Sequence, residues 1–147
     1  MTAAAATGST ASAQSQPPGR VRGLDHVAIP MRNTEAMVAF YKGLGLETTE
    51  NANAVSVHMG EQMINFHRPT RWQDKAFTLR APAATPPCGD ICVVWDGTAS
   101  DLTTVLGRLG VTVEEGPVER QGGRRRAGSS SYVRDPDGNL VEFIIYG

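Results

Sequence analysis

Apolar positions along this chain first alternate with polar ones and then recur at helical spacing. Residues 24–29 (LDHVAI) alternate and are closed by a proline, which predicts a short strand. The next apolar residues, at spacings of three and four, predict a helix with one apolar face; they are Met37, Phe40, Tyr41 and Leu44. Gly45 is the expected end of that helix. Strand candidates follow at 46–50, 55–59 and 63–67, so the first half of the chain is predicted to form a β-α-β-β-β unit.

The same order of elements returns in the second half of the chain. A strand is predicted at 90–95 and a helix at 99–109, followed by strands at 111–115, 130–134 and 139–146. The offset between the copies is 64 residues from His26 to Asp90 and 65 from Gly45 to Gly110. It rises to 75 at the last strand, which we attribute to an inserted loop at 120–129. The chain therefore contains the same structural module twice, in tandem.

The two modules span residues of about 23–68 and 88–147, and a proline-rich linker at 68–87 joins them. A turn at 135–139 (DPDGN) is predicted between the last two strands. A chain of 147 residues with 40% hydrophobic content suits one domain, which we place at 21–147. Residues 1–20 have no acidic, aromatic or large aliphatic residue beyond Met1, so we expect a disordered tail. A transit peptide is the alternative for this segment.

Composition excludes several classes of partner. The net charge is -1, with 14 basic and 15 acidic residues, so no overall field favours nucleic acid or an anionic membrane. No apolar run has the roughly 18 residues that a membrane helix needs. Two cysteines are too few for a disulfide scaffold, and a cytoplasmic location fits best.

Candidate chemistry lies on the polar faces of the predicted strands. Because side chains alternate along a strand, Asn65 and His67 face away from their apolar neighbours. The same alternation places Glu142 opposite the helices, between two aliphatic residues, where a carboxylate needs a partner. His26, His67 and Asp90 are the candidate partners. Two imidazoles with one or two carboxylates suit one divalent transition metal, namely Fe, Mn, Ni, Co or Zn.

Three segments carry a resemblance to a known family. They are LDHVAI at 24–29, FYKGLGL at 40–46 and RDPDGNLVE at 134–142. Together they resemble the vicinal oxygen chelate superfamily, which includes glyoxalase I, extradiol dioxygenases and bleomycin-binding proteins. The closest likeness is to small single-domain glyoxalase-domain proteins. The resemblance covers residues of about 23–147 and implies an α+β fold in which two tandem βαβββ modules form an open eight-stranded, cup-shaped barrel. It also implies a small-molecule substrate and a homodimer.

The resemblance implies metal ligation by His26, His67 and Glu142, and catalytic roles for Glu142 and Asp90. Glyoxalase I has glutamate on its fourth strand and histidine on its fifth, where this chain has His67 and Asp90. Asp90 is therefore a ligand, a base or a residue that orients a ligand. The favoured function is a metal-dependent, glyoxalase I-like lyase or isomerase. The alternatives are a non-haem Fe(II) extradiol-type dioxygenase and a metal-free, bleomycin-type antibiotic-binding protein.

Several other side chains allow two interpretations. The arginines at 124–126 are either solvated or bind an anionic substrate. Trp72, Phe77 and Trp95 either line a pocket or pack in the core. His58 is expected to be structural.

Overall fold

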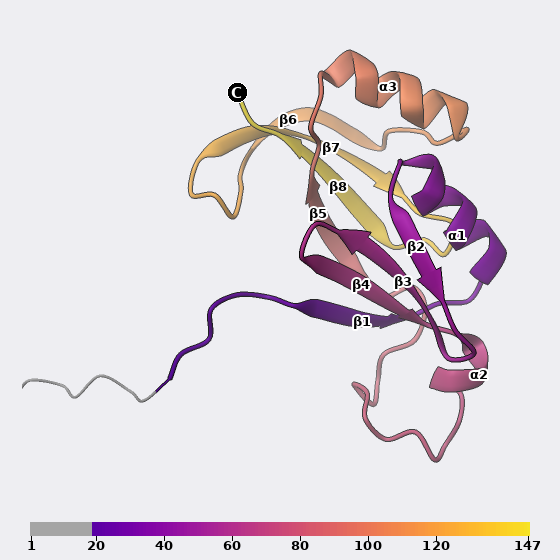
Figure 1. The fold of residues 1–147 in the computed structure, drawn as a ribbon. Coiled ribbons are helices and arrows are strands. Elements are labelled where there is room, and N and C mark those ends of the chain that lie inside the picture. The colour runs from indigo at the N-terminus through magenta and orange to yellow at the C-terminus, as the bar shows by residue number, and fades with distance from the viewer. Residues whose placement is uncertain (1–18) are drawn as a thin grey trace, which may run out of the picture.

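The computed structural model describes residues 19–147, so the predicted tail falls almost wholly outside the described residues. Two βαβββ modules follow one another along the chain, as Figure 1 shows by colour. Each module forms its own four-stranded sheet, and no strand of one sheet is hydrogen-bonded to the other. The α+β class and the duplicated module are thus confirmed. No helix among residues 19–147 is long and apolar enough to cross a membrane.

The first module follows the predicted pattern closely. Its elements are β1 (His26–Pro30), α1 (Thr34–Gly43), β2 (Glu47–Glu50), β3 (Ala54–Met59) and β4 (Gln62–His67). The strand order is β1-β4-β3-β2, with β1 parallel to β4 and the other pairs antiparallel. Met37, Phe40 and Tyr41 form the buried face of α1, because helical spacing brings them onto one side.

The second module repeats this topology. Its elements are β5 (Asp90–Val94), α3 (Ala99–Arg108), β6 (Glu115–Gln121), β7 (Ala127–Arg134) and β8 (Leu140–Ile145). The strand order is β5-β8-β7-β6, with β5 parallel to β8. Thr98 begins α3 with a capping box, in which Thr98 and Asp101 satisfy each other's backbone N–H groups. In both modules the first strand, β1 or β5, is therefore an edge of its sheet.

The second strand of the second module is not where the sequence predicted it. Residues 111–113 are irregular, and β6 begins at Glu115 and runs to Gln121. Half of the predicted loop at 120–129 is strand, because β6 and β7 extend into it from both sides as one long hairpin. Nearly all of β6 is exposed and it contains Pro117 at a bulge. An edge strand of this kind buries no face, so it lacks the alternation that reveals a strand.

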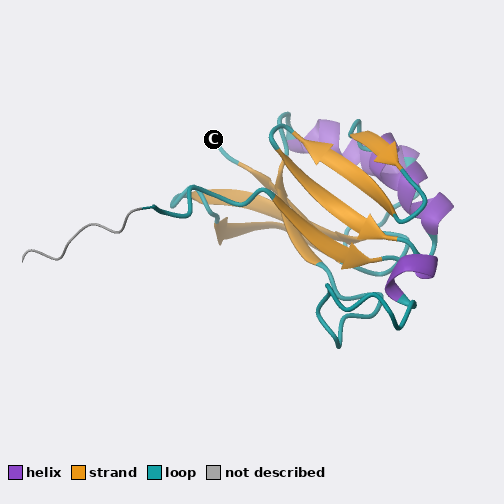
Figure 2. Ribbon diagram, turned by 60° about the horizontal axis from the view of Figure 1, so that its bottom comes forward, coloured by secondary structure: helices purple, strands orange, loops and turns teal. Residues whose placement is uncertain are grey.

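The linker between the modules is partly ordered. It contains a short helix, α2 (Pro69–Trp72), and then runs irregularly to the start of β5. Figure 2 shows this segment as loops at one end of the molecule, beyond the ends of the strands. Trp72 Nε1 donates a hydrogen bond to the Met31 carbonyl at 2.8 Å, so the linker folds back onto the end of β1.

The two modules share one hydrophobic core on the helix side of their sheets. Phe40 and Phe66 of the first module belong to the same buried cluster as Leu106 and Phe143 of the second. Both views show α1 and α3 on the same side of the molecule. The opposite faces of the sheets, which we call the open faces, are therefore the ones left for a functional site.

A polar turn also joins the modules. The residues at 135–139 form the predicted turn, with Gly138 at φ 93°. Asp137 accepts hydrogen bonds from the backbone N–H groups of Arg32 at 2.5 Å and Asn33 at 2.8 Å. Asp135 accepts one from the Tyr41 hydroxyl at 3.1 Å. We call residues 135–139 the junction turn, because it holds the start of α1 beside the start of β8.

Candidate functional site

The open face of the first sheet presents His26 at its edge. The side chain is 46% exposed, and its Nδ1 lies 2.6 Å from Asp25 Oδ1. When the imidazole is neutral, an Nδ1–H that donates to Asp25 leaves the Nε2 lone pair for another partner. A carboxylate behind an imidazole is the usual support of a metal-ligating histidine.

The register of the first sheet separates His26 from His67. His26 pairs with Met63, whereas His67 pairs with Pro30, four residues further along the same face. At a rise of about 3.3 Å per residue, four residues correspond to about 13 Å. The structure does not bring the two imidazoles together, and the shared ligand set stays a prediction.

The same register identifies the counterpart of Glu142 in the first module. Glu142 pairs with Cys92, the second residue after Asp90. The second residue after His26 is Ala28, and its partner is Asn65. Asn65, not His67, therefore occupies the position that matches Glu142. Strand alternation could not reveal this, because Asn65 and His67 lie on the same face two residues apart.

Glu142 is the best-supported acid on the open face of the second sheet. Its side chain is half-buried and accepts a hydrogen bond from the Ser130 hydroxyl at 2.5 Å. Cys92 is its register partner on the neighbouring strand β5. Burial and the Glu142 carboxylate, with a further contribution from Asp90, raise the pKa of the Cys92 thiol to about 12. Neither Ser130 nor Cys92 was predicted to support this acid.

Asp90 lies at the exposed start of β5. It pairs with Leu140, two residues before Glu142, so Asp90 and Glu142 share the open face. Asp90, Cys92 and Glu142 are thus brought to one sheet, and His26 is on the other. Among residues 19–147, no three His, Cys, Asp or Glu side chains of one chain converge as a metal site would require. One chain alone therefore does not assemble the predicted ligand set.

His67 lies instead at the end of β4, under the linker. Its ring meets that of Phe77 edge to face, with centroids 5.3 Å apart. Burial, followed by the guanidinium groups of Arg71 and Arg80, holds the pKa of His67 below its ordinary value. The imidazole is then neutral at neutral pH. Of the aromatic residues predicted to line a pocket, Trp72 does line a small cavity here, together with His67.

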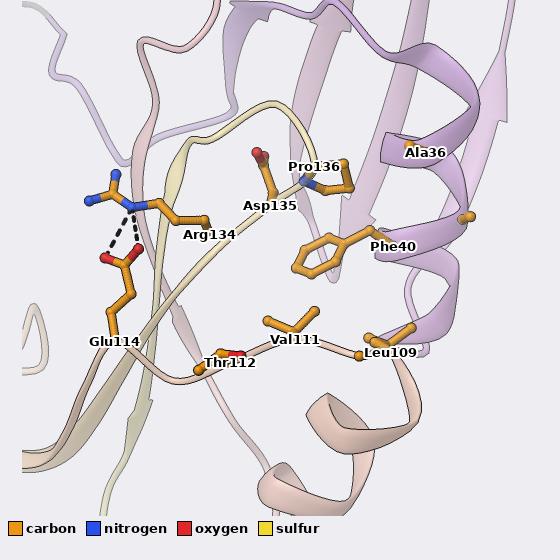
Figure 3. Close-up of a pocket in the computed structure, with 11 residues that line it drawn as sticks. Ala36, Phe40, Leu109, Val111, Thr112, Glu114, Arg134, Asp135 and Pro136 are labelled. Carbon is orange, nitrogen blue, oxygen red and sulfur yellow. Dashed lines mark hydrogen bonds and ion pairs between the residues drawn. The ribbon is translucent and has the colours of Figure 1, made fainter.

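The larger cavity is elsewhere. A shallow groove of about 530 Å³ lies between α1 and the segment that follows α3. In Figure 3, Phe40 of α1 reaches toward Val111, and the Glu114–Arg134 ion pair stands at the rim. None of the predicted site residues lines this groove. Its walls belong to the helix side of the molecule, away from the open faces.

The remaining sequence candidates have structural roles. His58 Nε2 lies 2.9 Å from the Thr49 hydroxyl, within the sheet. Arg124 and Arg126 are exposed, and their guanidinium carbons lie 5.0 Å and 4.9 Å from the ring centre of Tyr146. Trp95 packs edge to face on Phe143.

Comparison with known proteins agrees with this fold. A family model described as the glyoxalase/bleomycin resistance protein/dioxygenase superfamily matches residues 23–143. The virulence protein STM3117 of Salmonella typhimurium is 32% identical over 125 residues, which is 84% of this chain and 83% of that protein. The glyoxalase domain-containing protein RDO1 of Mycosarcoma maydis is 34% identical over 127 residues, 86% of this chain and 69% of that protein.

Among solved structures, lactoylglutathione lyase from Agrobacterium tumefaciens superimposes with a TM-score of 0.62 at 24% identity, over 88% of this chain and 96% of that chain. At this identity the likeness shows the fold alone.

Proposed function

The chain belongs to the glyoxalase/bleomycin resistance protein/dioxygenase superfamily, and from that premise we propose a metal-dependent lyase or isomerase whose site is shared by two copies of the chain. Members of this superfamily commonly bind small molecules and form oligomers. The observation that carries the proposal is the division of the candidate residues. His26 lies on the open face of one sheet, and Asp90 and Glu142 lie on that of the other.

Free sheet edges support the two-copy site. Among residues 19–147, β1 and β5 each pair with a strand on one side only, and an unpaired edge is a template for another strand. Two large apolar side chains stand exposed at these edges: Leu24, just before β1, is 61% exposed, and Val94 of β5 is 47% exposed. A homodimer that joins β1 of one copy to β5 of the other would cover both and form the eight-stranded cup.

The donor types fit a divalent transition metal once two copies contribute. One imidazole with carboxylates from Glu142 and Asp90 is a mixed nitrogen and oxygen set of intermediate hardness, suited to Fe, Mn, Ni, Co or Zn. Such an ion acts as a Lewis acid toward neighbouring substrate oxygens. The chain's own contribution is proton transfer: a carboxylate at Glu142 or Asp90 takes the proton beside the substrate carbonyl. The Ser130 hydroxyl holds the Glu142 carboxylate in place for this.

The geometry favours this proposal over ring-cleaving dioxygenase chemistry. The facial triad of non-haem Fe(II) oxygenases needs two histidines and one carboxylate on one ion. His26 and His67 are separated by four register positions, so the second histidine is not beside the first. A metal-free antibiotic-binding cup is the remaining alternative, and its ligand affinity would not respond to His26→Ala. Both cysteines are free thiols, which supports the proposed cytoplasmic location.

Mixing two inactive variants tests the shared site. His26→Ala and Glu142→Ala should each lose metal binding, measured by metal analysis after dialysis. After co-refolding in equal amounts, half of the dimers are mixed and each of these restores one intact site. Metal capacity should then recover to about a quarter of the wild-type value. Lyase activity with methylglyoxal and thiols should recover in parallel.

His58→Ala is the matched control, because His58 lies on β3, two strands from β1, with its Nε2 beside the Thr49 hydroxyl. Its loss should leave metal capacity unchanged. No recovery in the mixture would overturn the two-copy site. Full metal binding by His26→Ala would overturn the metal site itself. Oxygen uptake with catechols and Fe(II), without lyase activity, would favour the dioxygenase instead.

A further inference from the structure

The linker between the modules builds a small cationic cavity that the catalytic proposal leaves unused. The cavity has a volume of about 80 Å³, and its lining includes Ala28 and His67 from the open face of the first sheet and Trp72 and Arg80 from the linker. A single water needs roughly 10–15 Å³ of such space. The cavity therefore has room for a group larger than one water.

Arg80 lines this cavity, and Arg71 lies close enough to His67 to lower its pKa; neither has a carboxylate partner among the described residues. Arg80 donates a hydrogen bond to the Trp72 carbonyl at 3.0 Å and another to the Ala84 carbonyl, and its guanidinium stands 5.8 Å from the Trp72 ring centre. Arg71 stacks on Phe77, with 3.6 Å from guanidinium carbon to ring centre. Within residues 19–147, neither arginine forms a salt bridge. Backbone carbonyls and aromatic faces fix both cations but leave their charge uncompensated.

We propose that this cavity binds the anionic group, a carboxylate or a phosphate, of the small-molecule substrate. Arginine is suited to both groups because its planar fork of donors matches their paired oxygens. His67 adds one more polar atom to the lining, and Trp72, Ala28 and the linker alanines supply apolar walls. The surplus positive charge is what an anion would neutralise.

The position of the cavity relates it to the proposed catalytic site, so this inference rests on the proposed function for its biological meaning. Ala28 follows His26 on the same face, and His67 lies two register positions beyond Ala28. At about 3.3 Å per residue, the cavity begins about 7 Å from His26 and ends about 13 Å from it. A substrate that reacts beside His26 would place a charged group at the far end of the cup.

Tryptophan fluorescence gives a direct test without metal or activity. The chain has two tryptophans, so Trp95→Phe leaves Trp72, at the cavity wall, as the reporter. Inorganic phosphate and acetate are titrated separately into this variant at constant ionic strength with a chelator present. We expect a saturable change with at least one anion, and the anion that binds more tightly identifies the group. A linear or absent response to both would overturn the proposal.

Variants in the same background assign the binding to the arginines. Arg80→Gln should weaken binding at least tenfold, and Arg71→Gln, which breaks no hydrogen bond of the described residues, provides a second variant if the first unfolds. Arg108→Gln, at the exposed end of α3, removes the same charge elsewhere and should have no effect. Equal affinity in all three variants would overturn the site.

Failure of this inference is distinguishable from failure of the catalytic proposal. His26→Ala should bind the anion normally while losing metal, whereas Arg80→Gln should bind metal normally while losing the anion. His67→Gln should also keep its metal, which separates the role at this cavity from the ligand role that the sequence predicted.

Discussion

At the scale of single residues, the open face of the second sheet combines an acid, a hydroxyl and a thiol. The Glu142 carboxylate accepts a hydrogen bond from Ser130, and Cys92 is its register partner on β5. With a pKa of about 12, only about one Cys92 in 10⁴ is a thiolate at pH 8. Cys92 is therefore a poor nucleophile despite its exposure.

Removing the charge of Glu142 should make Cys92 reactive. Glu142→Gln removes the carboxylate that raises the thiol pKa, so the pKa should fall and alkylation by iodoacetamide at pH 8 should accelerate about tenfold or more. In the wild type, the Cys92 rate should instead rise with pH up to about 12, because only the thiolate reacts. Peptide mass spectrometry measures both cysteines at once. Cys88 is the internal control, and a Cys92 rate unaffected by Glu142→Gln would contradict the proposed contact.

At the scale of elements, the junction turn connects parts that are distant in sequence. Asn139 accepts hydrogen bonds from the backbone N–H groups of Cys88 and Gly89, which fixes the end of the linker. Asp137 holds the start of α1, and Asp135 holds Tyr41. Asp135, Asp137 and Asn139 are buried, so each lost contact leaves a polar group without water. The sequence predicted this segment only as the turn between the last two strands. It did not predict that the turn also connects α1 and the linker.

Asp137→Ala should destabilise the whole chain. The substitution leaves the backbone N–H groups of Arg32 and Asn33 without their acceptor, at a cost of about 2 kcal/mol or more in unfolding free energy. Asp137→Asn keeps one acceptor oxygen and should lose less. Urea denaturation followed by circular dichroism measures both. Asp96→Ala, at an exposed position outside the turn, should change the urea midpoint little. If Asp96→Ala lowered the unfolding free energy as much as Asp137→Ala, the prediction for the junction turn would be wrong.

Apolar periodicity predicts most of these elements from sequence, and its limits are physical. The two long helices and most strands bury one face, so their boundaries fall within about two residues of the predicted ones. β6 buries almost nothing and escapes detection. Alternation places Glu142 and His67 on open faces but repeats every two residues, so it cannot choose between Asn65 and His67. It also says nothing of whether two strands pair within a chain or between chains, and the proposed meeting of His26 with Glu142 depends on pairing between chains.

At the scale of the whole molecule, the free edges of β1 and β5 determine whether the proposed site can exist. Each open face carries only part of the candidate chemistry, and in the proposed dimer a second copy supplies the rest. Under this proposal, association is a condition of function. A charged residue placed at an edge that another strand would cover opposes such pairing.

Val94→Lys should therefore separate the copies. A lysine at this position on β5 would be desolvated by an adjoining strand, so sedimentation velocity should show a monomer where the wild type shows a dimer. Metal capacity should fall with it, while the thermal midpoint of the separated chain shows that it remains folded. Val113→Lys is the matched control, since Val113 is 38% exposed and lies outside both edges. A monomeric wild type that still bound metal would contradict the shared site.

The contact between Tyr41 and Asp135 also bears on how the chain folds. It joins residues 94 positions apart, whereas the β3–β4 and β6–β7 hairpins need only short loops to close. The entropic cost of loop closure must be met before a long-range contact contributes any stability, and folding slows as such contacts become more important. The hairpins can form early and independently, whereas the core shared by the two modules can form only after the junction turn is in place. A nascent chain therefore cannot complete the core that the two modules share until the junction turn at 135–139 has been synthesised.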